Sequence, residues 1–197
     1  GLFALASAQA VAGPLAFVTN QGPDTVSVLD LDAGKTLAII PVGKDPAGVT
    51  RDRSGRAIFV TNASDRSVSV IDVATLREKA RIQTGENPLA IAADPVRDRV
   101  YVGDFYEQRA EAFDSRSGAR LVEYATGQTP AGLAVTPDGA QLVVANRDDD
   151  ALQFIDLATG ATLGTLAVGK HPFGLTVSAD GRRLYAANVQ SNDVSEV

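Results

Sequence analysis

The sequence repeats itself every 42 residues, and this period constrains the fold more than any other feature of the chain. The stretch VTNQGPDTVSVLD at residues 18–30 returns as VTNASDRSVSVID at 60–72 and as VANRDDDALQFID at 144–156. Four independent markers keep the period: Asn20, Asn62, Asp104, Asn146 and Asn188; Asp30, Asp72, Asp114 and Asp156; Gly43, Gly85, Gly127 and Gly169; Pro46, Pro88, Pro130 and Pro172. A repeat of about 40 to 45 residues is the size of one four-stranded propeller blade.

Each repeat contains four short segments that favour strands. In the first repeat they lie at residues 16–20, 25–30, 37–42 and 47–50, and turn-forming Gly, Asp and Asn separate them. The glycines and the density of Val, Thr and Ile argue against a helical repeat. We therefore expect an all-β fold, a β-propeller of four-stranded antiparallel blades. About four and two-thirds blades are present, and we expect them to be part of a seven-bladed ring.

The segment after each proline is expected to be the innermost strand. It carries a small residue that permits close approach at the crowded axis, and the next residue is expected to pack between blades. The small residues are Gly48, Ala90, Gly132 and Gly174, and their larger neighbours are Val49, Ile91, Leu133 and Leu175. The recurrent Asn side chains are expected to bond the backbone of the following turn, and the recurrent Asp side chains to cap a tight turn.

The chain divides into a lead-in and one repeat domain. Residues 1–14 contain a short apolar run and the A-x-A sequence Ala8-Gln9-Ala10, so we expect the remnant of a secretory signal, with a disordered lead-in as the alternative. Residues 15–197 are expected to form the propeller, with units near 16–56, 57–99, 100–140, 141–183 and a partial unit at 184–197. A small ring of four or five blades, closed by pairing of the terminal strands, is the alternative to seven blades. We expect a periplasmic or extracellular protein.

Composition excludes several functional classes. A net charge of −6 without a basic stripe argues against nucleic-acid binding. The chain has no cysteine, which excludes disulfides and thiolate chemistry, and no segment is apolar for long enough to span a membrane. No nucleophile, phosphate-loop or haem motif is present, so we expect no cofactor and find no case for catalysis. The oligomeric state is left open.

The repeats resemble a known family. Phe59-Val60-Thr61-Asn62 followed by Val68-Ser69-Val70-Ile71-Asp72 is similar to the consensus of the YVTN β-propeller repeat family, and the resemblance covers residues 16–197. It implies an extracytoplasmic propeller, often seven-bladed. Members include surface-layer proteins and propellers that accompany quinoprotein (PQQ-dependent) oxidation systems, and methylamine-dehydrogenase-type heavy subunits are related in fold.

Residues that differ between repeats are the candidates for function. With the expected strand order, the loops after each Asn (asparagine loops) and the loops before each Pro (proline loops) share one face around the mouth of the central channel. The candidates for ligand or partner binding on this channel-mouth face are Lys44, Asp45, Glu86, Asn87, Phe105, Tyr106, Lys170, His171 and Phe173. His171 is the only histidine. Phe105 and Tyr106 form an aromatic pair in a loop that is polar elsewhere, which is typical of a contact site.

A carboxylate cluster follows Arg147. Asp148, Asp149 and Asp150 are weak candidates for a Ca²⁺ site, but the D-x-D-x-D-G spacing is absent, and a solvated turn is the favoured interpretation.

We expect a non-catalytic exported propeller that binds a protein partner or small ligand at the channel-mouth face, as an accessory to a periplasmic redox or catabolic system. One alternative is a propeller enzyme, a lyase, hydrolase or dehydrogenase-subunit fragment, that uses His171 and the carboxylates of the rim. The other alternative is a surface-layer scaffold.

Overall fold

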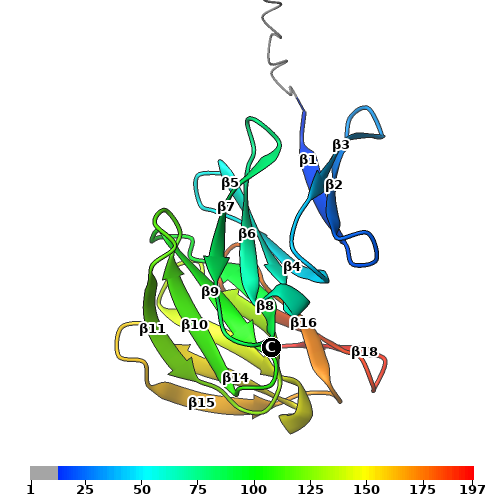
Figure 1. The fold of residues 1–197 in the computed structure, drawn as a ribbon. Helices are drawn as coiled ribbons and strands as arrows, with labels where there is room; N and C mark the ends of the chain where they lie inside the picture. Colours follow the sequence, from blue (N-terminus) through cyan, green and yellow to red (C-terminus); the bar gives the residue numbers. More distant parts are fainter. Residues whose placement is uncertain (1–12) are drawn as a thin grey trace, which may run out of the picture.

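The computed structural model describes residues 13–197, which form five antiparallel sheets arranged as blades around a common axis (Figure 1). The predicted signal remnant at 1–14 lies outside the described residues except for its last two positions. Within residues 13–197, no helix is long and apolar enough to cross a membrane. The expected all-β propeller with antiparallel four-stranded blades is confirmed, and the blades make a partial ring.

The strands are short and follow one pattern. Blade 1 holds β1 (Leu15–Asn20), β2 (Thr25–Asp30) and β3 (Lys35–Pro41). Blade 2 holds β4 (Pro46–Arg51), β5 (Ala57–Asn62), β6 (Ser67–Asp72) and β7 (Arg77–Gln83). Blade 3 holds β8 (Pro88–Ala93), β9 (Arg99–Asp104), β10 (Arg109–Asp114) and β11 (Arg120–Ala125). Blade 4 holds β12 (Pro130–Val135), β13 (Gln141–Asn146), β14 (Ala151–Asp156) and β15 (Thr162–Ala167), and blade 5 holds β16 (Pro172–Val177), β17 (Leu184–Asn188) and β18 (Asp193–Glu196).

The post-proline strand is the innermost one, as predicted. In blade 2 the order is β4-β5-β6-β7, and β4, β8, β12 and β16 contact one another from blade to blade. Blades 2 to 5 therefore each take the inner strand from the end of one sequence unit and the other strands from the next. Within the described part of the chain β1 and β18 belong to separate sheets and the five blades form a partial ring, so the alternative of a small ring closed by pairing of the terminal strands is wrong.

Two glycines show how closely the inner strands approach. A Cβ atom added at Gly48 would lie 2.5 Å from the carbonyl oxygen of Leu89 in blade 3, and one added at Gly132 would lie 2.1 Å from that of Phe173 in blade 5. Real side chains do not fit at these distances, so a missing side chain is required. The predicted close approach at the axis is confirmed at both positions.

The hydrophobic core lies between the blades. One cluster joins Phe59 and Val70 of blade 2 to Ile91, Val102 and Phe113 of blade 3, and all five side chains are buried. Burial of each such side chain contributes about 1.5 to 3 kcal/mol, and it requires the neighbouring blade. The predicted interblade packing holds for Ile91 and Leu133.

Val49 departs from this pattern. Its side chain is 38% exposed, although it occupies the position that is buried in blades 3 and 4. The preceding sheet contains β1, β2 and β3 but no inner strand among the described residues, so one flank of β4 is not covered there.

Candidate functional site

The asparagine loops and the proline loops lie on the same face of the propeller, as predicted. A backbone hydrogen bond joins one loop to the other in four successive blades: Ala63 N to Asp45 O at 3.1 Å, Phe105 N to Asn87 O at 2.9 Å, Arg147 N to Thr129 O at 3.0 Å, and Val189 N to His171 O at 3.0 Å. Because these bonds join backbone atoms, they do not depend on which side chains the two loops carry.

The recurrent Asn and Gly residues pack against each other. The amide nitrogen of Asn62 donates to the hydroxyl oxygens of Ser67 at 3.0 Å and Ser69 at 2.9 Å, and the side chain is fully buried. The expectation that it bonds the backbone of the turn is wrong, because the next strand presents two hydroxyls beside it. A Cβ atom added at Gly43 would lie 2.6 Å from this amide, so the buried amide leaves no room for a side chain at Gly43.

In blade 3, charged side chains take the positions of the neutral Asn and Ser. Asp104 stands in the position of the Asn and Glu111 in that of Ser69, and both carboxylates are buried. Arg109 lies 3.5 Å from Asp104, Arg120 lies 2.9 Å from Glu111, and Glu111 also accepts the Gly85 N–H at 2.9 Å. The sequence analysis placed Asp104 among the recurrent Asn positions and did not identify Glu111. Its signal was an acidic residue on a buried strand face where other repeats carry Ser or Gln.

The recurrent Asp residues at the ends of the third strands behave as predicted. The carboxylate of Asp114 accepts the backbone N–H groups of Arg116 at 3.1 Å and Ser117 at 2.7 Å. The hydrogen bonds from the backbone and hydroxyl of Ser117 are the largest cause of a lowered pKa at Asp114. Asp30 and Asp156 accept the equivalent backbone bonds in their own turns. These residues stabilise the repeat and are not candidates for function.

Lys44, Asp45, Glu86 and Asn87 lie in two neighbouring proline loops. The backbone N–H of Lys44 donates to Asp65 at 3.2 Å, and that of Asp45 donates to Asp24 at 2.9 Å, which fixes the first loop. In the second loop Glu86 forms an ion pair of 2.5 Å with Arg66. The side chains of Lys44, Asp45 and Glu86 are exposed, so they line the rim as predicted.

His171 has a conformational role in its loop. Its φ of 54° is left-handed, its N–H donates to Asp150 at 2.9 Å, and its carbonyl accepts from Val189. The ammonium group of Lys170 donates to the same carboxylate at 2.6 Å, and these two contacts, that of Lys170 first, lower the pKa of Asp150. No hydrogen bond joins the His171 imidazole to another side chain among residues 13–197.

The three aspartates after Arg147 accept hydrogen bonds from different groups. Asp148 accepts the Thr129 hydroxyl at 2.6 Å, Asp149 accepts the Gln128 N–H at 2.7 Å, and Asp150 is engaged by Lys170 and His171. In the described part of the chain, no group of three His, Asp or Glu side chains has the geometry of a metal site. The geometry favours the solvated-turn interpretation of this cluster.

Phe105 and Tyr106 form an aromatic pair on the asparagine loop of blade 3. Their rings pack edge to face with centroids 5.1 Å apart, and Tyr106 is 68% exposed while Phe105 is half-buried. The backbone N–H of Phe105 donates to the carbonyl oxygen of Asn87, so a hydrogen bond within the protein holds this part of the loop. A rigid loop therefore presents an exposed tyrosine ring on the channel-mouth face.

The central channel holds a cavity of about 340 Å³ between the inner strands. Phe173 lines it together with Gln21, Ala47, Leu89 and Ala131, and most of its wall is small and apolar. The other eight predicted binding residues are not among the lining residues. The structure thus brings the candidates to one face but does not gather them into one pocket.

Comparison with known proteins agrees with this architecture. The model of the family described as "Lactonase, 7-bladed beta-propeller" matches residues 106–197, less than half of the chain. A chain of Kuenenia stuttgartiensis hydrazine synthase superimposes with a TM-score of 0.80 at 22% sequence identity, over 87% of this chain and 51% of that one.

The chain is a β-propeller. It spans about half the length of the hydrazine synthase chain that it matches, and at 22% identity that likeness shows the fold alone. No curated protein matches the sequence.

Proposed function

We propose that this propeller binds a protein partner or small ligand on its channel-mouth face without catalysing a reaction. The exposed ring of Tyr106, packed against Phe105 on a loop anchored to Asn87, carries this proposal. Aromatic side chains held on rigid backbone lose little conformational entropy on binding and dominate many interfaces. Glu86, beside Asn87 in the proline loop bonded to this asparagine loop, adds a charged group next to the aromatic pair.

A site-specific crosslink tests this function. A photoreactive phenylalanine analogue is placed at Tyr106 in the producing cells, and a matched one at Leu163, which is 56% exposed on the outermost strand β15. We expect a discrete adduct at Tyr106 that is absent at Leu163 and that weakens when Glu86→Ala is added. Equal labelling at the two positions, or none at Tyr106, would contradict the proposal.

Lactone hydrolysis is the second candidate function, and the family match supports it. The matched residues include Asp150, whose carboxylate accepts hydrogen bonds from the Lys170 ammonium at 2.6 Å and from the His171 backbone N–H at 2.9 Å. The test is turnover of a lactone panel, followed by acid release at constant pH, with His171→Ala and Glu86→Gln as variants. Turnover that both substitutions abolish would replace the binding proposal by the enzymatic one.

We also propose that the protein is exported and that its partner belongs to a quinoprotein oxidation system. The A-x-A pattern at residues 8–10 and the resemblance to YVTN repeats support this proposal. Fractionation of the producing cells tests the location, and co-purification with a PQQ-dependent dehydrogenase tests the partner. A protein found only in the cytoplasm would contradict export.

A further inference from the structure

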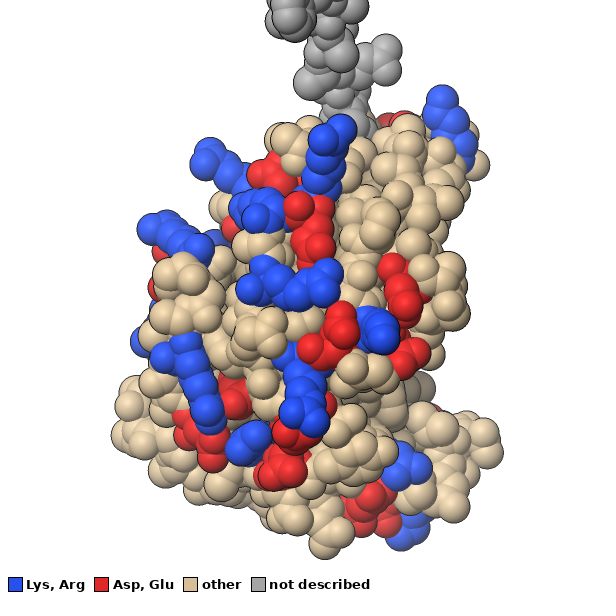
Figure 2. Space-filling view, viewed as in Figure 1, with Lys and Arg blue, Asp and Glu red and all other residues tan. Residues whose placement is uncertain are grey.

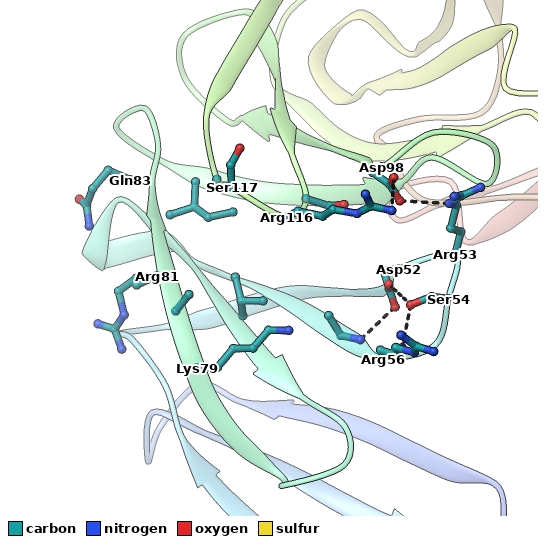
Figure 3. Close-up of a pocket in the computed structure, with 16 residues that line it drawn as sticks. Asp52, Arg53, Ser54, Arg56, Lys79, Arg81, Gln83, Asp98, Arg116 and Ser117 are labelled. Carbon is teal, nitrogen blue, oxygen red and sulfur yellow. Dashed lines mark hydrogen bonds and ion pairs between the residues drawn. The ribbon is translucent and has the colours of Figure 1, made fainter.

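A second pocket lies away from the channel-mouth face, between blades 2 and 3. It has a volume of about 450 Å³ and is enclosed by the loop at residues 52–56, by strand β7 and by the turn at residues 115–118 of the next blade (Figure 3). The loop joins β4 to β5 and the turn joins β10 to β11, so both lie at the strand ends opposite the asparagine loops. Apolar side chains such as Val70 and Ile82 also line the pocket.

Four cationic side chains surround this pocket, and we call them the interblade cations: Arg53, Arg56, Lys79 and Arg116. Figure 3 shows Lys79 extending from β7 toward Arg56, with Arg116 above it and Arg53 beside Asp98. Arg81 also lines the pocket, but Figure 3 shows it turned the other way, and it is paired with Glu78 at 2.9 Å and with Asp65 at 3.1 Å. Both ion-pair partners of Arg81 belong to its own blade, so Arg81 is not counted among the interblade cations.

The interblade cations are incompletely neutralised. Arg53 and Arg116 share the single carboxylate of Asp98, at 3.1 Å and 2.7 Å. The Lys79 ammonium lies 3.9 Å from Asp72, at the limit of an ion pair. Within residues 13–197 no carboxylate is within ion-pair distance of Arg56. The one other carboxylate lining the pocket, that of Asp52, accepts the Ala57 N–H at 2.9 Å and the Ser54 hydroxyl.

This positive pocket occurs in a protein whose net charge is −6. In the view of Figure 2, Lys and Arg side chains, interleaved with Asp and Glu, gather over blades 2 and 3, whereas blade 1 presents mostly uncharged surface. A local cationic pocket in an acidic protein attracts anions at short range only, because salt screens charges beyond about 8 Å at physiological ionic strength.

Comparison of the repeats shows whether the junction between blades requires these cations. The positions of Lys79 and Arg116 in the next repeat are occupied by Leu121 and Ala158, and those of Arg53 and Arg56 by Pro95 and Asp98. In the repeat after that, Pro137, Ala140 and Leu163 stand in the positions of Arg53, Arg56 and Lys79. The same blade junction therefore forms without these cations. Their presence at this one junction is not explained by packing.

We propose that the pocket between blades 2 and 3 binds a small, multiply charged oxyanion, a compound that carries phosphate groups or several carboxylates. Guanidinium groups donate two parallel hydrogen bonds to such oxyanions, and lysine adds a point charge. Arg53 and Arg116 are already oriented by Asp98, so less side-chain entropy is lost when an anion binds. This site is independent of the function proposed for the channel-mouth face.

Calorimetric titration at constant ionic strength tests the site. The probes are pyrophosphate and citrate, which distinguish phosphate from carboxylate recognition, with chloride as the monovalent comparison. We expect at least one of the two polyanions to bind at one site per chain. The variant Lys79→Leu/Arg116→Ala places the residues of the next repeat at this junction, so folding is expected to be retained, and circular dichroism checks it.

The proposal predicts that removing positive charge inside the pocket weakens binding more than removing it elsewhere. We expect the double variant to weaken binding by about tenfold or more, because two charge-assisted contacts are lost. The control Lys35→Ala/Arg182→Ala removes the same charge at exposed positions outside the pocket and should change the affinity by less than about twofold. Failure of both polyanions to bind the folded wild-type protein, or equal weakening by the two variants, would overturn the proposal.

Discussion

The hydroxyl of Tyr101 donates a hydrogen bond of 3.0 Å to the carboxylate of Asp94, and both side chains are buried in blade 3. Asp94 also accepts the backbone N–H groups of Val96 and Arg97, each at 2.8 Å, so it ties the loop between β8 and β9 to the core strand β9. The equivalent positions in blades 1 and 2 hold Phe17 and Phe59. Blade 5 holds Tyr185 at this position but has Ser178 in place of Asp94, so within the described residues the bond from tyrosine to aspartate is made in blade 3.

Tyr101→Phe is expected to lower the free energy of unfolding by about 1 to 2 kcal/mol, because the ring still fits and only the buried hydrogen bond is lost. Urea denaturation measures the change. Tyr106→Phe is the matched control, since its exposed hydroxyl has no buried partner, and it should leave stability unchanged. Equal effects of the two substitutions would contradict the role given to the bond.

Stability should also fall at alkaline pH through Tyr101. Burial, and then the neighbouring Asp94, raise the pKa of Tyr101 above its ordinary value of 10. The folded state then retains a proton that the unfolded chain releases, so this stabilisation is complete below pH 10 and decreases as the pH rises above it. Melting temperatures between pH 9 and 11 should fall less steeply in Tyr101→Phe than in the wild type. Parallel curves would argue against a shifted tyrosine.

Two glycines at equivalent positions should respond differently to alanine. In Gly132→Ala the new Cβ atom meets the Phe173 carbonyl oxygen at 2.1 Å, whereas in Gly174→Ala the nearest contact is Ala187 at 3.6 Å. We expect Gly132→Ala to cost about 3 kcal/mol or more through overpacking and Gly174→Ala to be nearly neutral. Thermal unfolding of the two variants compares them directly. A tolerated Gly132→Ala would mean that the inner strands lie farther apart.

The buried charges of blade 3 should be exchangeable for the neutral group of blade 4. There Gln153 and Thr162 occupy the positions of Glu111 and Arg120 and are joined by a hydrogen bond of 2.8 Å. Arg120→Thr alone leaves the Glu111 carboxylate underpaired and should destabilise the fold by about 1 to 3 kcal/mol. Adding Glu111→Gln should restore most of that loss in chemical denaturation. A double variant that is less stable than Arg120→Thr would show that the charges themselves are required.

Much of the fold follows from local sequence. Turn chemistry and the alternation of apolar residues place the strands within one or two residues, and the Pro-x-Gly segment correctly marks the inner strand at Gly48 and Gly132. Repetition strengthens each of these signals, because a residue present in every unit serves a contact present in every blade. The shared face of the asparagine and proline loops follows from strand order alone.

The partners of individual side chains were decided by the tertiary structure. Asn62 finds hydroxyls on β6 instead of the turn backbone, and Glu111 lies beside Arg120 on the adjacent strand β11. The pocket between blades 2 and 3 joins Arg53, Lys79 and Arg116, which no spacing in the sequence brings together. A repeat specifies which residues each blade carries, but which of them meet across a junction depends on the packing distance between blades and on where each long side chain points.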